Sequence, residues 1–491
     1  MASSAVFAIL VTVVLWASQA LIRGVSGPLR KVPGPWYAPF TNLPLKWATI
    51  TGRRVYFIDA LHQQYGDVVR VAPNEVCFRD PATVKEIHRP GSGFRKDKWY
   101  IKLSGDHGNS NPAKHGLFTL ADNKSHSARR KLLARAFSKS ELRKNWEEEI
   151  RTTVLHAVKR MMDDADAHEG EVDVQKWWLL MAADVSSRIA FGESFNMLDT
   201  GEVNSYMNAV ERIAKLNGIC AELPVLKLMR FAPIPSVQKF FSSNESVMEM
   251  SASVVQNSRS SSVGTNIFTG ILAEAEKGNT LISDAVLTIE ARGLIVAGSD
   301  TTAITLTFLV WTILSRPQLH KQLVEELREK VPDKFTDEDL EKLPLMNAVI
   351  QEALRLYGAA PGSLPRNPPP GGATLGGFYM PEDVVVSTQA WSLHRNPDIW
   401  KDPEEFDVTR WLPGAKLTDT MRSSFSPFGW GSRMCLGIHI AETELRLGTA
   451  TFFKLYPAAR LAPSTTPESM TPENFFIINP KAHQCKVLLK R

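Results

Sequence analysis

One uninterrupted helical segment places the main constraint on the fold of this chain. Ser283 can cap the start of this segment, and no proline follows until Pro317. The segment between them is about 32 residues, or roughly 48 Å long at 1.5 Å per residue. Because a helix of this length crosses a whole domain, we expect a large domain built around it.

The middle of this helix contains poor helix formers. The stretch "LIVAGSDTT" (294–302) places Gly298, Ser299, Asp300 and two threonines in an otherwise apolar segment. One interpretation is a simple kink, in which each threonine hydroxyl bonds to a carbonyl one turn earlier. The other is a functional weak point where the helix bends or widens. The helix alone does not choose between them.

The composition is that of a globular protein and excludes several functional classes. The chain has 491 residues, of which 44% are hydrophobic and 22% are charged, so it can bury a large core. Its four cysteines are too few and too scattered for a disulfide framework or a zinc site of paired cysteines, and they favour a reducing compartment. The formal net charge of +5 is far from the dense basic surface of a nucleic-acid-binding protein. We therefore expect no nucleic-acid partner.

Short β segments interrupt a mostly helical pattern. The stretch "GDVVRVAPNEVCF" (66–78) has apolar runs that break at Pro73 and Asn74, and "ATLGGFYMPEDVVVS" (373–387) has the turn signals of a hairpin. A polar loop, "NSRSSSVGTN" (257–266), is expected to join two helices. The predicted fold class is mainly α with small β-sheets.

The N-terminus has the features of a membrane anchor. Ala5 to Ile22 run without a charge, which just reaches across a bilayer core, and Arg23, Arg30 and Lys31 follow. A cleaved signal peptide is the alternative, but the leading "MASS" has no basic residue. Basic residues on the C-terminal flank favour a cytosolic location for the rest of the chain. We predict an anchor with its flank over residues 1–30 and one large domain over 31–491, joined through the stiff "VPGPW" hinge.

Cys435 lies in an unusual loop, "FSPFGWGSRMCLGIHI" (425–440). Gly429 and Gly431 permit a tight turn, and a new helix is predicted from Gly437 to Leu447. A thiolate at a helix N-terminus is stabilised by the free backbone N–H groups there. A lone cysteine in a loop is usually an inert buried residue, so the case for chemistry depends on the residues around it.

Those residues resemble the haem-binding loop of the cytochrome P450 family. Phe428, Gly431, Arg433, Cys435 and Gly437 stand at that family's spacing. Three further stretches stand in the family's order: "AGSDTT" (297–302), "EALR" (352–355) and "FDVTRW" (406–411). The resemblance covers essentially the whole chain and is strongest to microsomal ascomycete fungal members of secondary metabolism. It implies the cytochrome P450 fold, preceded by a single N-terminal transmembrane helix.

The resemblance implies haem b as the cofactor, with the Cys435 thiolate as the axial ligand of its iron. Phe428 would shield the sulfur, and Gly431 and Gly437 would let backbone amides approach it. The haem propionates would be bound by a set of polar and basic side chains: His126, Arg130, Arg366 and Arg433. His126 stands where the family usually has tryptophan, so its role as a donor depends on its tautomer.

Two further groups of residues take roles from the resemblance. Glu352, Arg355 and Arg410 would form a structural ion-pair triad, although this chain reads "VTR" (408–410) where the family usually has Pro-Glu-Arg. Asp300 and Thr301 match the acid–alcohol pair that delivers protons to dioxygen, with a widened helical turn at Ala297 and Gly298. That pair favours a monooxygenase over two alternatives: a haem-thiolate enzyme of redox-neutral rearrangement and a non-catalytic haem-binding protein.

The resemblance also implies partners and a substrate class. The chain has no dinucleotide-binding fingerprint, so NADPH electrons would come through a separate flavoprotein reductase. A basic stretch from Arg129 to Lys144 is a candidate docking surface, and a solvated helix that also binds propionates is the equal alternative. The predicted pocket is small or apolar and favours a hydrophobic polyketide or terpenoid; its residues are Leu294, Ala297, Thr301, Ala360, Pro361, Gly362, Ser363 and Leu364. We predict a single-pass protein of the endoplasmic reticulum membrane with its catalytic domain in the cytosol.

Overall fold

The computed structural model describes most of the chain: residues 24–103, 111–231, 266–277 and 282–490, with Phe7, Val11, Ser18, Gln19, Leu21, Ile22, Pro233, Ile234 and Gln238. The polar loop at 257–265 and most of the predicted membrane anchor lie outside these residues. Both therefore stay predictions.

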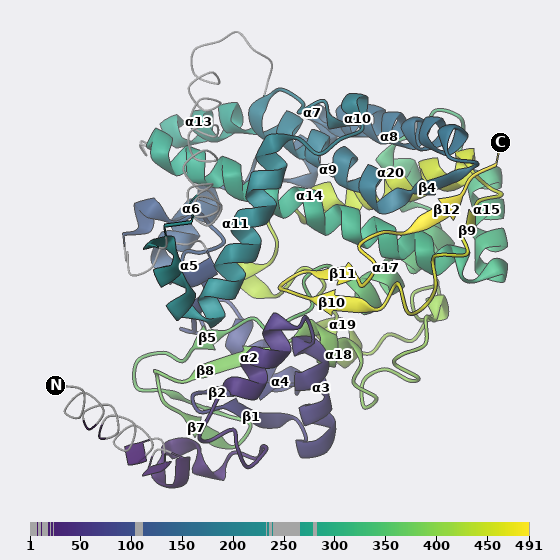
Figure 1. Ribbon diagram of the computed structural model, residues 1–491. Helices are drawn as coiled ribbons and strands as arrows, with labels where there is room; N and C mark the ends of the chain where they lie inside the picture. Colours follow the sequence, from purple (N-terminus) through teal and green to yellow (C-terminus); the bar gives the residue numbers. More distant parts are fainter. Residues whose placement is uncertain are drawn as a thin grey trace.

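Helices dominate the described residues, and a smaller β-rich part lies beside them (Figure 1). The helices of the β-rich part are α2 (Leu43–Ile50), α3 (Arg54–Tyr65), α4 (Pro81–His88) and α18 (Ala390–His394). The larger helical part contains α5 (Trp99–Leu103), α6 (Asn123–Ala134), α7 (Lys139–Asn145), α8 (Glu147–Ala167), α9 (Val174–Phe191), α10 (Met197–Thr200), α11 (Ser205–Glu222), α13 (Ile267–Lys277), α14 (Asp284–Leu314), α15 (Pro317–Lys330), α16 (Asp337–Glu341), α17 (Pro344–Tyr357) and α20 (Ile438–Leu455). A short α19 (Asp419–Ser424) precedes the loop that carries Cys435.

The main sheet has five strands in the order β1-β2-β8-β5-β3. Its strands are β1 (Val68–Ala72), β2 (Glu75–Phe78), β8 (Val385–Thr388), β5 (Arg366–Asn367) and β3 (Arg95–Lys96). The β1–β2 hairpin and the hairpin of β6 (Ala373–Leu375) with β7 (Phe378–Met380) confirm the two predicted β segments. β2 pairs in parallel with β8, so the sheet joins residues about 310 positions apart, as in the pair Cys77–Ser387. Smaller sheets are formed by β4 (Glu171–Asp173), β12 (Lys486–Leu488) and β9 (Arg460–Leu461), and by β10 (Pro472–Asn474) with β11 (Ile478–Pro480).

The predicted long helix is α14, and it forms the centre of the helical part (Figure 1). The Ser283 hydroxyl caps its start by accepting a hydrogen bond from the N–H of Val286 at 3.4 Å. Among the described residues, α14 is the one helix long and apolar enough to cross a membrane, and 61% of its most apolar window is buried inside the protein. Such burial is typical of a core helix.

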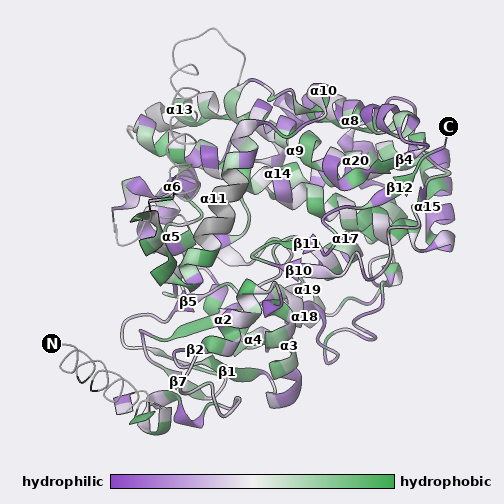
Figure 2. Ribbon diagram, viewed as in Figure 1, coloured by the Kyte–Doolittle hydropathy of each residue, from purple (hydrophilic) through white to green (hydrophobic). Residues whose placement is uncertain are grey.

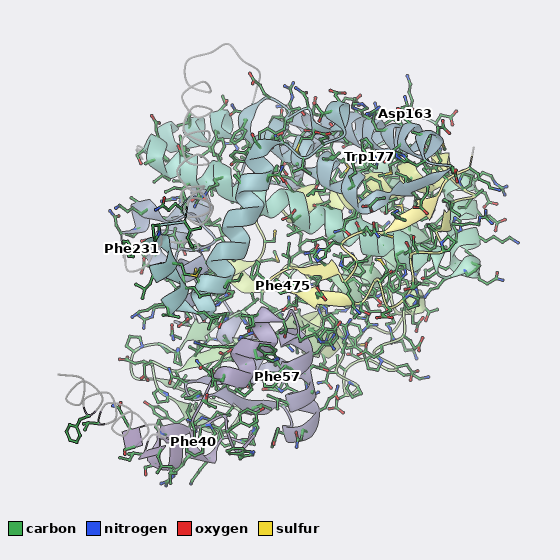
Figure 3. The ribbon with its side chains drawn as sticks, in the orientation of Figure 1. Phe40, Phe57, Asp163, Trp177, Phe231 and Phe475 are labelled. Carbon is green, nitrogen blue, oxygen red and sulfur yellow. The ribbon has the colours of Figure 1, made fainter. Side chains whose placement is uncertain are left out.

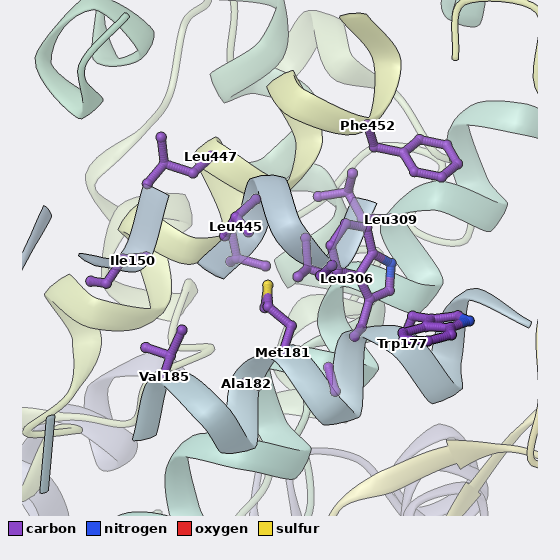
Figure 4. Packing of buried hydrophobic residues seen from close by; sticks show 14 of the residues in the cluster. Ile150, Trp177, Met181, Ala182, Val185, Leu306, Leu309, Leu445, Leu447 and Phe452 are labelled. Atoms are coloured by element: carbon purple, nitrogen blue, oxygen red, sulfur yellow. The ribbon is translucent and has the colours of Figure 1, made fainter. Parts of the chain in front are cut away.

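The largest core cluster surrounds α14 and extends through α8, α9, α17 and α20. Figure 4 shows Met181 of α9 beside Leu306 of α14, with Leu445 of α20 close to them, and other members of the same cluster around them. The distribution of hydropathy agrees with this core, because hydrophilic residues gather on the outer faces of helices such as α8 and α15 (Figure 2). The contact between α9 and α14 is close, since a Cβ on Gly298 would overlap the Ser186 hydroxyl.

The side chains of the two parts belong to separate apolar clusters. Trp177 lies in the large helical cluster, whereas Phe57 packs against a smaller cluster around the β1–β2 hairpin and α3 (Figure 3). The predicted site residues lie on α6, α14 and α17 of the helical part, on β5 of the main sheet, and in the loops that lead to β5 and to α20. The site therefore lies where the helical and β-rich parts meet.

Candidate active site

The loop of Cys435 is a tight turn that ends at the start of α20. Gly429 and Gly431 have φ angles of +78° and +59°, which side-chain-bearing residues rarely adopt. The N–H of Cys435 donates to the carbonyl of Phe428 at 2.8 Å and closes the turn. Gly437 is the residue before the first turn of α20, as predicted. Cys435 thus faces the positive end of an 18-residue helix.

Gly431 and Gly437 differ in their surroundings. A Cβ on Gly431 would overlap the carbonyl oxygen of His88 at the end of α4, so this glycine is needed for packing as well as for its φ angle. A Cβ on Gly437 would meet nothing within 4 Å. The Gly437 N–H donates to the Cys435 sulfur and lowers the pKa of the thiol. Gly437 therefore lies near the sulfur, in line with the role that the resemblance implies.

Cys435 is accessible to solvent, although protein atoms surround much of its side chain. Burial raises the pKa of the thiol, while the Gly437 N–H and Arg130 lower it. Iron coordination would deprotonate the sulfur regardless, because a metal-bound thiol is held as the thiolate. The other three cysteines are buried.

Five basic or imidazole side chains gather beside this loop. Arg433 donates to the carbonyls of Leu120 and Ala121 at 2.7 and 3.2 Å, and Arg130 donates to the carbonyl of Met434 at 2.7 Å. Arg366 donates to the Tyr100 hydroxyl at 3.0 Å. The other two members are His126 and Lys96, both buried.

The electrostatics of this basic cluster are unfavourable without an anion. Burial lowers the pKa of Arg433 to about 10, with Arg366 adding to the effect. Burial also lowers the pKa of His126 to about 3, with Arg433 and Lys96 adding to it, so the imidazole is neutral. Among the described residues, no carboxylate forms an ion pair with Lys96, Arg130, Arg366 or Arg433. Buried cations are ordinarily paired, so the cluster fits a ligand that carries carboxylates.

The predicted triad is assembled around Glu352 of α17. Arg355 meets its two carboxylate oxygens at 2.7 and 2.8 Å, and Arg410 lies 3.3 Å from Oε1. The N–H groups of Asp407 and the Trp411 indole donate to the same carboxylate at 3.0 and 2.8 Å. The side chains of Glu352 and Arg355 are both 0% exposed. "VTR" therefore replaces the usual motif without loss of the arginine contact.

His394 connects this triad to the cysteine loop, a role that no sequence pattern indicated. Its Nε2 accepts from the N–H of Ser426 at 2.9 Å, so its Nδ1 carries the proton and donates to the carbonyl of Arg355 at 2.8 Å. Burial lowers the pKa of His394 to about 3, which keeps the ring neutral. The backbone of the cysteine loop is thus fixed to α17 through one imidazole.

The middle of α14 has the hydroxyl-to-carbonyl bonds of the first interpretation and the open surface expected of a functional site. The Thr301 hydroxyl donates to the carbonyl of Ala297 at 2.6 Å, and the Ser299 hydroxyl donates to the carbonyl of Ile295 at 2.8 Å. The helix α14 continues through this stretch without a break. The predicted widening at Ala297 and Gly298 is therefore absent from the helix as described, because these hydroxyls supplement the helical hydrogen bonds. Leu294, Ala297 and Thr301 nevertheless form a stripe that protein atoms leave partly or fully uncovered, whereas Ala291, Ile295 and Ser299 of the same segment are buried.

A buried acid lies directly behind that stripe. Glu444 of α20 accepts a hydrogen bond from the Thr302 hydroxyl at 3.0 Å and is 1% exposed. Burial raises the pKa of Glu444 to about 8, so the carboxyl is protonated at neutral pH. This hydrogen bond joins the middle of α14 to the helix that follows Cys435. Because Glu444 and its partner are 142 positions apart, no local pattern in the sequence indicates the pair.

The remaining predicted pocket residues lie on the segment between α17 and β5. Ala360, Gly362 and Leu364 are half-buried, and Pro361 and Ser363 are buried. A Cβ on Gly429 would lie 4.0 Å from the Leu364 side chain, which places this segment beside the cysteine loop. The Ser363 hydroxyl is buried without a hydrogen-bond partner. The segment is small and apolar, with one unsatisfied hydroxyl.

These residues fit haem. The described residues contain no group of three or more His, Cys, Asp or Glu side chains placed to hold a metal ion. An iron that reaches this site with four porphyrin nitrogens needs only one protein ligand, and Cys435 can supply it. The basic cluster fits the two propionates, and the open space at Gly437 leaves room for a flat group beside the sulfur. The fold and the site therefore define a haem-thiolate protein.

Comparisons with known proteins agree with this assignment. The cytochrome P450 family model matches residues 33–487, so the chain belongs to the cytochrome P450 family. The cytochrome P450 monooxygenase aflV of Aspergillus parasiticus is 42% identical, with 94% of this chain and 91% of the relative covered. The cytochrome P450 monooxygenase stcB of Emericella nidulans is 40% identical, with 96% and 90% covered. These relatives are fungal, as the resemblance predicted.

A more distant relative and a solved structure extend the comparison. A methylphloroacetophenone oxidase of Cladonia uncialis is 31% identical, over 79% of this chain and 87% of the relative. The crystal structure of cytochrome P450DA heme domain matches with a TM-score of 0.75 at 20% identity, covering 94% of this chain and 98% of that chain. At this identity the match supports the fold, which is the cytochrome P450 fold.

Proposed function

We propose that this protein is an NADPH- and dioxygen-dependent monooxygenase that hydroxylates or otherwise oxidises a hydrophobic small molecule in fungal secondary metabolism. The observation that carries the proposal is the exposed Cys435 thiol at a helix N-terminus, combined with an uncovered stripe on α14 that ends in Thr301. Two fungal relatives named as cytochrome P450 monooxygenases, which this chain matches over 91% and 90% of their lengths, support it.

The residues of this chain would have separate roles in binding haem and in delivering protons. Haem, when bound, supplies the iron chemistry that activates dioxygen. Cys435 would hold the iron as its thiolate, and the basic cluster would fix the plane of the macrocycle through its carboxylates. The Thr301 hydroxyl donates its hydrogen bond to the carbonyl of Ala297, so its lone pairs can accept a hydrogen bond from a water molecule and hold it in place. Asp300, half-buried on the same helical turn, would exchange protons with that water.

The predicted pocket favours a substrate with few polar groups. Apolar side chains from α14 and from the 360–364 segment would enclose it, and the hydroxyls of Thr301 and Ser363 are the polar side-chain groups that these pocket residues offer. This supports a bulky polyketide or terpenoid intermediate. A redox-neutral rearrangement remains the second candidate, and it is distinguished by turnover without NADPH or reductase.

Electrons would come from a separate flavoprotein reductase. The Arg129–Lys144 stretch offers less surface for docking than its seven basic residues suggest. Three of the seven are half-buried: Arg129 pairs with Glu290, Arg130 belongs to the basic cluster, and Arg143 pairs with Glu341. The exposed basic positions in this stretch are Lys131, Arg135, Lys139 and Lys144, and Lys139 pairs with Glu341. We place the protein at the endoplasmic reticulum membrane through the apolar N-terminal run, with the catalytic domain in the cytosol.

Deletion of the gene in its source organism tests the proposed function. We expect a hydrophobic compound one oxygen atom lighter than the lost product to accumulate, detected by high-resolution mass spectrometry of extracts. The purified protein should then convert that compound only when NADPH, a reductase and dioxygen are supplied together. Conversion of the compound without NADPH would instead establish the redox-neutral rearrangement.

Thr301→Ala is expected to separate electron consumption from product formation. The alanine cannot hold water on the α14 stripe, so proton delivery is impaired while haem binding, which uses other residues, is retained. We expect product per NADPH consumed to fall by roughly a hundredfold, the lower end of a general acid–base contribution. Thr301→Ser keeps the hydroxyl and should restore most of the coupling. Full coupling in the alanine variant would show that Thr301 has no part in proton delivery.

A further inference from the structure

Residues 115–121, here called the strap, connect α14 to the basic cluster beside the cysteine loop. At one end, Gly116 packs so closely on α14 that a Cβ on it would lie 3.2 Å from the Ile289 side chain. At the other end, the carbonyl of Leu120 accepts a hydrogen bond from Arg433 at 2.7 Å. The strap therefore runs from the helix that lines the predicted pocket to the predicted haem site.

The carboxylate of Glu290 holds the α14 end of the strap. The Leu117 N–H donates to both carboxylate oxygens, at 3.0 and 3.1 Å. Arg129 of α6 donates to Oε1 at 2.6 Å, and the side chains of Arg129 and Glu290 are only 13% and 6% exposed. Burial raises the pKa of Glu290, whereas the Leu117 N–H and Arg129 lower it. The charge of this buried carboxylate is therefore sustained by the two groups that it joins.

Glu290 lies on the helical face that carries the predicted pocket. Leu294, Ala297 and Thr301 follow it at i+4, i+7 and i+11, which places these side chains on one side of α14. Glu290 is buried where the strap meets α14, whereas the three residues after it are partly or fully uncovered. The strap therefore ends at the boundary between the covered part of this face and its open stripe.

The two ends of the strap are held by different groups. On the side of the basic cluster, Lys96 donates to the carbonyl of Phe118 at 2.5 Å and Arg433 donates to that of Leu120. The N–H of Leu120 donates to the Gly116 carbonyl at 3.1 Å, so the strap is a compact turn. Release of the Glu290 carboxylate would therefore free the α14 end while the other end stays attached.

We propose that Glu290 and Arg129 form a latch that holds the strap against α14 and sets the rate at which ligands enter and leave the pocket. When this ion pair separates, the Leu117 N–H loses its charged acceptor and the α14 end of the strap moves away from the open stripe. Both are positioning residues, because they act through the strap. The inference rests on the pocket of the proposed monooxygenase but not on its reaction, so ligand binding alone tests it.

The test measures how fast 4-phenylimidazole binds to and leaves the ferric, haem-loaded, full-length protein, followed by the shift of the haem absorption band in stopped flow. Glu290→Gln keeps an acceptor for the Leu117 N–H and removes the charge. Because charged hydrogen bonds are about twice as strong as neutral ones, we expect association and dissociation both to become faster by about tenfold. The dissociation constant should stay nearly unchanged, because a latch alters the route into the pocket and not the bound complex.

Asp337→Asn is the matched control, because it breaks a comparable ion pair between two other helices. Asp337 of α16 and Arg446 of α20 are also 2.6 Å apart, and their side chains are 1% and 9% exposed. The loss should destabilise the protein as loss of Glu290 does, while both ligand rates stay unchanged. Unaltered rates in Glu290→Gln would overturn the proposal. Equal acceleration in Asp337→Asn would also overturn it, since general loosening would then explain both.

A second variant carries the test if Glu290→Gln does not accumulate as folded protein. Arg129→Met combined with Glu290→Gln leaves no unpaired charge at the latch, so the fold should tolerate it better. Both rates should again rise by about tenfold, and unaltered rates in this double variant would overturn the proposal. The ferrous carbon monoxide spectrum checks the Cys435 assignment separately, and a failure of NADPH-dependent turnover would leave the binding rates interpretable.

Discussion

Cys435→Ser is expected to abolish the red-shifted carbon monoxide spectrum of the ferrous haem. Serine has nearly the same shape as cysteine, so the turn closed by the Cys435 N–H and the Phe428 carbonyl should survive. Its hydroxyl, however, does not ionise in the range in which a thiol does, and it cannot donate electron density to iron as a thiolate does. We therefore expect complete loss of the spectrum, lower haem content and no measurable turnover. The measurement is the difference spectrum of reduced protein with and without carbon monoxide.

Cys77→Ser provides the matched control for this experiment. Cys77 is buried on β2 and its sulfur lies 3.0 Å from the Ser387 hydroxyl. A serine at this position can retain that hydrogen bond, so the spectrum and haem content should match those of the unaltered protein. A red-shifted spectrum that persists in Cys435→Ser would mean that another residue ligates the iron.

The features that were predictable from sequence are those with local causes. The extent of α14 follows from a capping serine and a distant proline, and the helix after Cys435 begins at Gly437 as its spacing indicates. Glu352 and Arg355 are three residues apart on one helix, so their contact follows from the helical repeat alone. The motif residues of the cysteine loop likewise lie within ten positions of one another.

The features that were missed depend on pairing between distant segments. Lys96 appears in sequence as one of several polar residues in a surface-like stretch, and its burial arises only when β3 pairs with β5 270 positions later. His394 gains its role from contacts to Arg355 and Ser426, each more than 30 positions away. No local pattern encodes such contacts, because strand register and loop packing are decided by the assembled sheet and core.

Glu352→Gln is expected to destabilise the protein by about 3–5 kcal/mol, the usual range when one partner of a buried ion pair is removed. Glutamine matches glutamate in shape but leaves two buried guanidinium groups, those of Arg355 and Arg410, without a counter-ion. Urea unfolding followed by circular dichroism measures the loss. Haem content should fall in parallel, because α17 holds the cysteine loop through His394.

The control for Glu352→Gln is an ion pair of the same length on the surface. Lys481 and Glu468 are 2.7 Å apart, as are Arg355 and Glu352, but their side chains are 50% and 80% exposed. Water replaces the lost partner at the surface, so Lys481→Ala should cost no more than about 1 kcal/mol. Equal losses in the two variants would contradict the assignment of Glu352 as the centre of a buried network. A much larger loss in Glu352→Gln would mean that burial, rather than the distance between the charges, makes this triad necessary for the haem-binding fold.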